Sequence, residues 1–460
     1  MTTNNRPGRR PPLEPDRTGV RLGIFWLTPG ISRGNAATLF FSSFSVISLV
    51  TFMTFVQPYL LQEVLHIPKD IQGSLIGTLQ SMQEGILVLV ASFIGASSDK
   101  LGRRVVYIAG VCLFAAGFII YPLAGTTAQL YVFRVVYALG YATASVMLHV
   151  CLAEYSQETS RGRWLGTIGI FNGLGVVLMA VGLSRMPQWY IGLGFDSVQA
   201  IRLSYWTFSA YLLVLAILMR LGLAAGTTHV NRRESSLKIA TRGFAAAREN
   251  PRILLAYAMA FASRGDLAIL TVFFSLWMLQ RGTELGMTAA ESMVKAGMLF
   301  GLSQAVGLLW SFPIGWIMDR LHRMTAMCLA FGLAAAGYLS LGLIEDPFGG
   351  MIVVACVLAG MGESSAMTAG GVMIGQEAPA SSRGAVLGTY SLMGALGIMA
   401  LTFVGGQLFD RVGSAGPFVM MGCVNLVVLT GVLVLRRSAL RNMKQSGLTG
   451  PEAVPGVQEQ

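Results

Sequence analysis

Long runs of apolar residues alternate with short polar segments along the whole chain. Each run is near the roughly 20 residues that a helix needs to cross a bilayer. The runs predict about twelve spanning helices, near 36–62, 71–96, 104–124, 127–155, 164–184, 201–222, 252–280, 290–318, 325–343, 350–375, 384–409 and 416–435. The alternating ten-residue strands of a membrane β-barrel do not occur in the sequence. We therefore expect an all-α integral membrane protein.

The composition supports this prediction. Hydrophobic residues make up 54% of the 460 residues and charged residues only 12%, whereas an ordinary soluble domain has about 25% charged residues. The five cysteines all lie inside apolar runs and include no Cys-x-x-Cys pair. We therefore expect buried thiols, no disulfide framework and no metal site.

The basic residues give the expected orientation. The formal net charge is +11, and about four times as many Lys and Arg fall in alternate loops and tails as in the remaining loops. The positive-inside rule then places both termini and the central linker in the cytoplasm. Basic residues spread in this way indicate topology, and they argue against nucleic-acid binding, which would gather them on one soluble face. The polar, Pro- and Arg-rich N-terminal tail is expected to be disordered and not a signal peptide.

Two stretches of the sequence occur twice at nearly one spacing. GASSDKLGRR at 95–104 aligns without gaps with GWIMDRLHRM at 315–324, 220 residues later. SRGRWLGTIG at 160–169 aligns with SRGAVLGTYS at 382–391, 222 residues later. The spacing predicts two similar halves of six spans each, which an even number of spans places in parallel orientation. The expected segments are a cytoplasmic tail at 1–35, bundles at 36–222 and 252–436, a cytoplasmic linker at 223–251 and a second tail at 437–460.

With these repeats the sequence resembles the major facilitator superfamily. That family carries Gly-x-x-x-Asp-(Arg/Lys)-x-Gly-(Arg/Lys)-(Arg/Lys) between its second and third helices, and GASSDKLGRR fits every defined position. GWIMDRLHRM resembles the degenerate copy between helices eight and nine, with His322 in place of Gly and Met324 in place of a base. The resemblance covers nearly the whole chain and implies the family's fold of two six-helix bundles.

The residues of this motif divide by what each can do. They are Gly95, Asp99, Lys100, Gly102, Arg103 and Arg104 in the first copy, and Gly315, Asp319, Arg320 and Arg323 in the second. A cytoplasmic anchor and turn would explain the bases alone. Gly95 lets a neighbouring helix approach closely, and Asp99 can accept from a helix N-terminus or pair with a base. The resemblance implies that the cluster is a gate latch, formed in one access state and broken in the other.

A second cytoplasmic motif lies at the ends of the fourth and tenth spans. Its residues are Glu154, Arg161 and Gly162, with Glu377, Arg383 and Gly384 in the other half. The segment AEYSQETSRG at 153–162 resembles the fourth-helix exit of sugar and organic-solute porters. GIFNGLG at 169–175 has Leu174 where drug antiporters of the family have proline, which lowers the prospect of drug efflux without excluding it.

Charged residues inside the predicted spans are the candidate substrate and proton pathway. They are Glu84, Arg134, Arg264, Asp266 and Glu363. A charge at the bilayer centre costs roughly 2.5–3.5 kcal/mol, so each needs a partner or a function. In the family's fold, helices one, four, seven and ten line the cavity, and this places all but Glu84 on cavity helices. The alternative is that these residues only neutralise one another as ion pairs.

Asp266 and Glu363 are the preferred proton carriers, because a desolvated carboxylic acid can exchange protons near neutral pH. Arg134 resembles the family's fourth-helix arginine, but its usual glutamine is missing. Arg264 and Asp266 lie roughly 200° apart around a helix, so they cannot face one site unless Gly265 distorts the helix.

The sequence therefore predicts a secondary active transporter of a small organic solute that works by alternating access. Protons are the expected coupling ion, and no cofactor is expected. Drug efflux antiport is the first alternative and a transport-inactive membrane sensor is the second. No nucleophile, metal or phosphate motif indicates an enzyme. We expect a monomer in the lipid bilayer of the bacterial inner membrane that binds no nucleic acid.

Overall fold

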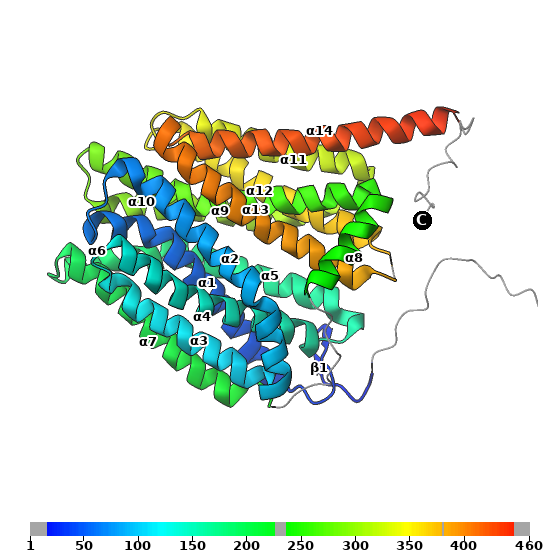
Figure 1. Cartoon of the computed structure of the whole chain (residues 1–460), viewed down its shortest axis with the longest axis horizontal. Coiled ribbons are helices and arrows are strands. Elements are labelled where there is room, and N and C mark those ends of the chain that lie inside the picture. Colours follow the sequence, from blue (N-terminus) through cyan, green and yellow to red (C-terminus); the bar gives the residue numbers. More distant parts are fainter. Residues whose placement is uncertain (1–15, 226–235, 380, 446–460) are drawn as a thin grey trace, which may run out of the picture. The chain divides into compact units, whose positions relative to one another are not determined.

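The computed structural model describes residues 16–225, 236–379 and 381–445, and these residues are almost entirely helical (Figure 1). Twelve helices in this part of the chain are long and apolar enough to cross a membrane, which confirms the predicted all-α membrane architecture. The first half has α1 (Arg33–Glu63), α2 (Lys69–Leu101), α3 (Arg103–Ile120), α4 (Thr127–Tyr155), α5 (Arg161–Val181), α6 (Met186–Gly192) and α7 (Ser197–Gly222). The second half has α8 (Ser236–Glu249), α9 (Pro251–Glu284), α10 (Ala289–Arg320), α11 (Arg323–Gly342), α12 (Met351–Glu377), α13 (Arg383–Val412) and α14 (Gly416–Gln445). Three single turns of 3-10 helix lie at η1 (Tyr121–Leu123), η2 (Glu158–Ser160) and η3 (Leu183–Arg185).

The described chain forms two compact units. One contains residues from 1–66, 85–233 and 289–297, and the other contains residues from 67–84, 234–288 and 298–460. Two helices are therefore shared, because α2 changes unit after Glu84 and α10 changes unit after Gly297. The boundaries expected from the sequence at the linker and tails stay predictions, and residues 1–15, 226–235 and 446–460 lie outside the described part.

Polar side chains fix where several of the helices begin. Ser32 and Asn35 form a reciprocal capping box at the start of α1. Thr126 accepts from the backbone of Gln129 at the start of α4, and Asp196 accepts from the backbone of Gln199 at the start of α7. These side chains satisfy backbone N–H groups that have no partner within the helix. The apolar spans therefore begin at residues that the sequence marks with Ser, Thr or Asp.

Glycines hold the same pair of helices together in each half of the chain. In one unit α3 crosses α4, with Gly117 against Tyr137 and Gly140 against the backbone of Phe114. In the other unit α11 crosses α12, with Gly337 against the backbone of Ala359 and Gly362 against that of Ala334 (Figure 1). The equivalent glycines lie 220 and 222 residues apart, which are the spacings of the sequence repeat. The duplication therefore extends from the loop motifs into the packing of the spans.

A methyl group at these crossings is expected to destabilise the protein. The Cβ of an alanine at Gly140 would lie 2.6 Å from Phe114 Cα, and one at Gly362 would lie 2.5 Å from Ala334 Cα. Because backbone cannot yield as a side chain can, we expect Gly140→Ala and Gly362→Ala each to cost about 1–3 kcal/mol. The matched control is Gly169→Ala in α5, where the added Cβ would meet nothing within 4 Å. The measurement is thermal unfolding of the purified variants, and equal melting temperatures for Gly140→Ala and Gly169→Ala would refute the packing argument.

The N-terminal tail is not disordered throughout, contrary to the expectation from its composition. Strands β1 (Arg21–Leu22) and β2 (Phe25–Trp26) pair antiparallel, and the segment from residue 16 to 31 lies on the loop between α4 and α5. The backbone N–H of Thr28 donates to the carbonyl of Tyr155 at 3.0 Å, and that of Gln157 donates to the carbonyl of Trp26 at 2.9 Å. Four consecutive apolar residues at 24–27 explain the error, because an average over the tail hides so short a cluster. Leu27 among them is fully buried.

Part of the linker between the halves is also a packed helix. α8 contacts α9 and α13, and the Tyr257 hydroxyl donates to the carbonyl of Gly243 at 3.1 Å. Ala247 of α8 joins a buried cluster with Ile253 and Val386. The C-terminal end of the linker is therefore bound to the second unit.

Candidate functional site

The first copy of the repeated motif, GASSDKLGRR at 95–104, is built around Arg103. Its guanidinium forms an ion pair with Asp99 at the end of α2 and a second with Glu154 at the end of α4, the latter at 3.1 Å. It also donates to the Ser98 hydroxyl at 2.5 Å. Arg103 is only 8% exposed, so these charges lie close together with little water between them. The arrangement fastens the ends of three helices through one side chain.

The other residues of this copy have simpler surroundings. Gly102 takes φ = +95°, a left-handed conformation that favours glycine, and separates α2 from α3. Arg104 donates to the carbonyls of Arg220 and Leu223 at the end of α7, at 3.3 and 3.4 Å. Gly95 is buried and Lys100 is exposed. Arg104 therefore contacts the end of α7, whereas Arg103 contacts the ends of α2 and α4.

The ion pairs of the second copy differ from those of the first. Arg323 pairs with Glu377 at the end of α12, and Arg252 pairs with the same carboxylate at 3.2 Å. Asn250 also donates to Glu377, at 3.1 Å. Asp319 is exposed and forms no ion pair with any described residue. The aspartate of the motif therefore forms an ion pair in the first copy, and among the described residues it forms none in the second.

The remaining residues of the second copy and of the helix-end motif are exposed or local. Arg320 lies over the ring of Trp316 at 4.1 Å, and a Cβ on Gly315 would meet nothing within 4 Å. Arg161 pairs with Glu158 at 2.5 Å in the same loop. Gly162, Arg383 and Gly384 are exposed at the starts of α5 and α13.

Two of the predicted intramembrane acids lie together in the second unit. Asp266 of α9 is fully buried and accepts from the side-chain amide of Asn425 of α14 at 2.8 Å. Glu363 of α12 is 6% exposed and accepts from the side-chain amide of Gln304 of α10 at 3.1 Å. Tyr338 of α11 donates to the backbone carbonyl of Asp266 at 2.6 Å and lies within electrostatic range of both acids. We call these five residues the acid cluster.

The acid cluster contains no base. Within the described ranges, neither Asp266 nor Glu363 forms an ion pair. Asp266 Oδ2 and Asn425 Oδ1 are buried without a hydrogen-bond partner. A buried carboxylate that has neither a cation nor a full set of donors costs far more free energy than the protonated, neutral acid. The geometry therefore suits acids that carry a proton.

The other predicted membrane charges stand apart from the acid cluster. Arg264 is exposed on the opposite side of α9, where its side chain packs against Gly394 of α13. The separation of Arg264 from Asp266 around one helix is as predicted. Glu84 is 3% exposed in α2. Arg134 is fully buried in the first unit, where it donates to Gln57 at 3.3 Å and lies 5.0 Å from the centre of the Tyr137 ring.

Sequence reasoning missed Asn425, Tyr338 and Gln304. Asn425 carried a usable signal, because it is the single strongly polar side chain within the apolar run 416–435. Gln304 and Tyr338 carried no such signal, because polar residues of this kind recur in spanning helices. Their role depends on which helices pack together.

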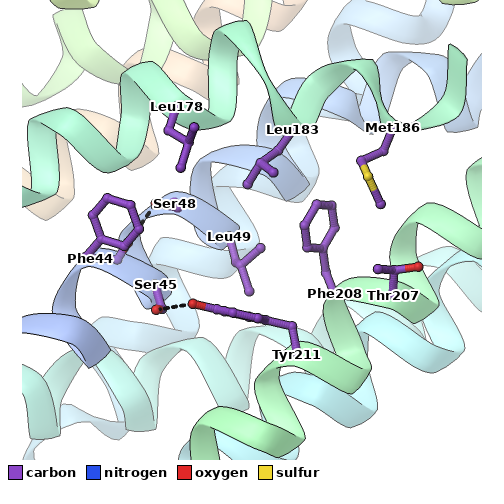
Figure 2. Close-up of a pocket in the computed structure, with 10 residues that line it drawn as sticks. All are labelled: Phe44, Ser45, Ser48, Leu49, Leu178, Leu183, Met186, Thr207, Phe208 and Tyr211. Atoms are coloured by element: carbon purple, nitrogen blue, oxygen red, sulfur yellow. Dashed lines mark hydrogen bonds between the residues drawn. The ribbon is translucent and has the colours of Figure 1, made fainter. Parts of the chain in front are cut away.

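The first unit also contains an apolar cavity of about 300 Å³. Figure 2 shows its lining, which consists of Phe44, Ser45, Ser48, Leu49, Leu178, Leu183, Met186, Thr207, Phe208 and Tyr211. Ser45 and Tyr211 share a hydrogen bond of 2.6 Å. None of the predicted pathway residues lines it. The volume is at the lower end of the range for small-molecule pockets.

Curated relatives of the chain include two kinds of magnetosome protein. The chain is 27% identical over 418 residues to the magnetosome protein MamH of Paramagnetospirillum magneticum, an alignment that covers 88% of this chain and 93% of the relative. It is 24% identical over 398 residues to MamZ of Magnetospirillum gryphiswaldense, covering 81% of this chain but only 58% of that longer protein. A segment of 122 residues, 26% of this chain and 30% of the relative, is 32% identical to the class G tetracycline resistance protein of Vibrio anguillarum.

Solved structures share the fold at low sequence identity. The nucleoside transporter NupG matches with a TM-score of 0.66 at 14% identity, over 87% of this chain and 98% of that one. A bacterial homologue of the human lysosomal transporter Spinster matches with a TM-score of 0.64 at 15% identity, over 88% and 97% of the two chains.

A sequence profile matches almost the full length. The profile of the Major Facilitator Superfamily fits residues 38–350 and 282–455. Together with the twelve candidate spans, the glycine crossings repeated in both halves and the transporter folds it resembles, this profile identifies the family, and the chain belongs to the Major Facilitator Superfamily.

Proposed function

We propose that this chain is a proton-coupled secondary transporter that moves a small organic solute by alternating access. Membership of a transporter family supports the general class. The observation that supports proton coupling is the acid cluster. In this cluster Asp266 and Glu363 are buried among amides and a phenol without a base. A carboxyl in such a place serves transport only if it can lose its proton when water reaches it. Alternating access supplies that water from one side at a time.

Solute flux in proteoliposomes tests the proposal. Purified protein is reconstituted, and a panel of labelled nucleosides, sugars, amino acids and organic acids is offered with and without a pH gradient. We expect at least one solute to accumulate only when the gradient is present and to undergo counterflow without it. Counterflow with no response to the gradient would reject proton coupling. No flux of any solute by folded protein would favour the transport-inactive sensor.

Drug efflux is the second candidate, because a quarter of the chain aligns at 32% identity with a tetracycline resistance protein. Against it, Leu174 stands where drug antiporters carry proline. Cells that produce the protein should show unchanged susceptibility to tetracycline if the protein moves a different organic solute. A several-fold rise in the inhibitory concentration, abolished by Glu363→Gln, would favour efflux.

The proposed setting is a monomer in the bacterial inner membrane, with both termini in the cytoplasm. The names of MamH and MamZ suggest the magnetosome membrane as the alternative compartment. A fluorescent fusion at the C-terminus distinguishes a uniform cell outline from a row of internal foci. Light scattering of the purified protein decides the oligomeric state.

A further inference from the structure

The outer end of α2, opposite the cytoplasmic motif, is fastened to α13 by Asp410. One carboxylate oxygen accepts from the backbone N–H of Gly73 at 2.8 Å, and the other accepts from that of Ser74 at 2.7 Å. These N–H groups lie in the second turn of α2, which begins at Lys69. Hydrogen bonds from backbone N–H groups to a carboxylate are charge-assisted and stronger than those to a neutral acceptor. Asp410 is half-buried, so this contact is partly shielded from water.

Glycines allow α13 to come this close to α2. A Cβ on Gly73 would lie 2.8 Å from Phe409 Cβ, and one on Gly406 would lie 3.1 Å from Ser74 Cα. A Cβ on Gly77 would lie 3.2 Å from Gly406 Cα. One turn further along, the Ser81 hydroxyl donates to the carbonyl of Met399 at 2.7 Å. The backbones of α2 and α13 are therefore in contact along the outer half of α2. A side chain at any of these glycines would push the two helices apart.

The residues that make this contact repeat the spacing of the cytoplasmic motif. GQLFDRVG at 406–413 has Gly, Asp, a base and Gly at the same intervals as GASSDKLG at 95–102. Both final glycines take a positive φ directly after their helix ends, +112° at Gly413 and +95° at Gly102. The two bases that follow Gly102 are replaced by Ser414 and Ala415. Bases serve on the cytoplasmic side, so a copy at the outer end keeps the glycines and the aspartate and has no use for them.

The unit boundaries indicate what the contact does. Residues 67–84 of α2 belong to the second unit and the rest of α2 belongs to the first. The two ends of α2 are thus attached to different units, with the boundary after Glu84. If the units move against each other, α2 must bend near Glu84 or one of its two attachments must break. Beside Asp410 lies a polar cavity of about 400 Å³, lined also by Lys69, Gln280 and Gly413, through which water can replace the lost bonds.

We propose that Asp410 is an outer gate residue of the transport cycle, which holds α2 against α13 through Gly73 and Ser74 and releases it when the outer side opens. The neighbouring ion pair between Lys69 and Glu284, at 3.4 Å and about half-exposed, is too hydrated to hold the gate alone. Gln280 of α9 also donates to the carbonyl of Lys69 at 3.1 Å and to the Gln72 side chain at 3.0 Å. The backbone bonds of Asp410 attach α2 to α13, and Gly73 is the residue that makes them possible. This inference rests on the proposed alternating access.

Spin-label distances test the gate without any substrate. Labels are placed at Ile71→Cys on α2 and Val412→Cys at the end of α13, both of which are exposed, with the five native cysteines replaced. We expect one short distance in the parent protein in lipid nanodiscs. Asp410→Asn, which keeps one acceptor but loses the charge and the second bond, should raise the ratio of long to short distances about tenfold, or about 1.4 kcal/mol. Gly73→Ala blocks the same contact from the other helix and should do the same.

The matched control is Asp196→Asn. Asp196 also caps an outer helix start, but among the described residues its side-chain hydrogen bond is to its own helix, α7. It should leave the distances unchanged. Unchanged distances in both Asp410→Asn and Gly73→Ala would overturn the gate, as would an equal shift in Asp196→Asn. Because the labels report opening without transport, failure of the gate is distinguishable from failure of the proposed flux.

Discussion

Asp266→Asn and Glu363→Gln are each expected to abolish solute accumulation while solute exchange continues. With a pH gradient of about two units and one proton per solute, a coupled transporter accumulates its solute up to about 100-fold, since each pH unit is a factor of ten. An amide has the shape of a protonated acid but has no acidic proton to release, so the variants should reach a ratio near one. Counterflow moves no net proton and should remain. Labelled solute in proteoliposomes measures both.

The control for this pair is Glu249→Gln, because Glu249 is an exposed acid on α8 outside the acid cluster. It should accumulate solute as the parent protein does. Full accumulation by both Asp266→Asn and Glu363→Gln would place the coupling proton elsewhere, with Glu84 the next candidate. Loss of both accumulation and counterflow, with folded protein, would instead assign the two acids to solute binding or to the conformational change.

Arg103→Ala is expected to destabilise the protein more than Arg323→Ala does, although the two arginines are equivalent in the repeat. Removing Arg103 leaves Asp99 and Glu154 side by side without that cation, in a place where their side chains are 16% and 26% exposed. Removing Arg323 leaves Glu377 with Arg252 and Asn250. Breaking a buried pair costs about 3–5 kcal/mol, and partial exposure reduces this to about 2 kcal/mol for Arg103 and about half that for Arg323.

Thermal unfolding of the two purified variants measures this difference. Adding Asp99→Asn to Arg103→Ala should recover part of the loss, because it removes one of the two carboxylates that lose the Arg103 guanidinium. The same melting temperature for Arg103→Ala and Arg323→Ala would show that the two copies are energetically equivalent, and that the contacts of Glu377 with Arg252 and Asn250 contribute little.

The spans and the repeat could be predicted because each depends on residues that can be recognised from the sequence without knowing their contacts. Apolar runs near the bilayer thickness mark the helices, and the spacing of 220 to 222 residues between motifs recurs in the glycines of the α3–α4 and α11–α12 crossings. The fold class follows from these features alone. The helix start at Asn250 and Pro251 is marked in the same way, by a cap and a fixed φ.

The partners of the site residues could not be predicted in this way. Asp266 and Asn425 are 159 positions apart, and only the packing of α9 against α14 brings them together. The contact of Asp410 could not be predicted either, because nothing near it in sequence shows that Gly73 and Ser74 of α2 lie against it. The second copy of the repeated motif pairs differently from the first, since Arg252 from another helix reaches Glu377.

The glycine crossings supply a fixed length within a protein whose proposed transport cycle requires motion. With backbone against backbone at Gly117 and Gly140, α3 and α4 cannot slide or separate without losing contact along their length. Labels on Ile119 and Val132, which are exposed on these two helices, should therefore keep one distance in every state of the protein. Such a pair is an internal reference distance. If it stays constant, a change in the label distance between α2 and α13 reports movement of these helices and not loosening of the whole molecule.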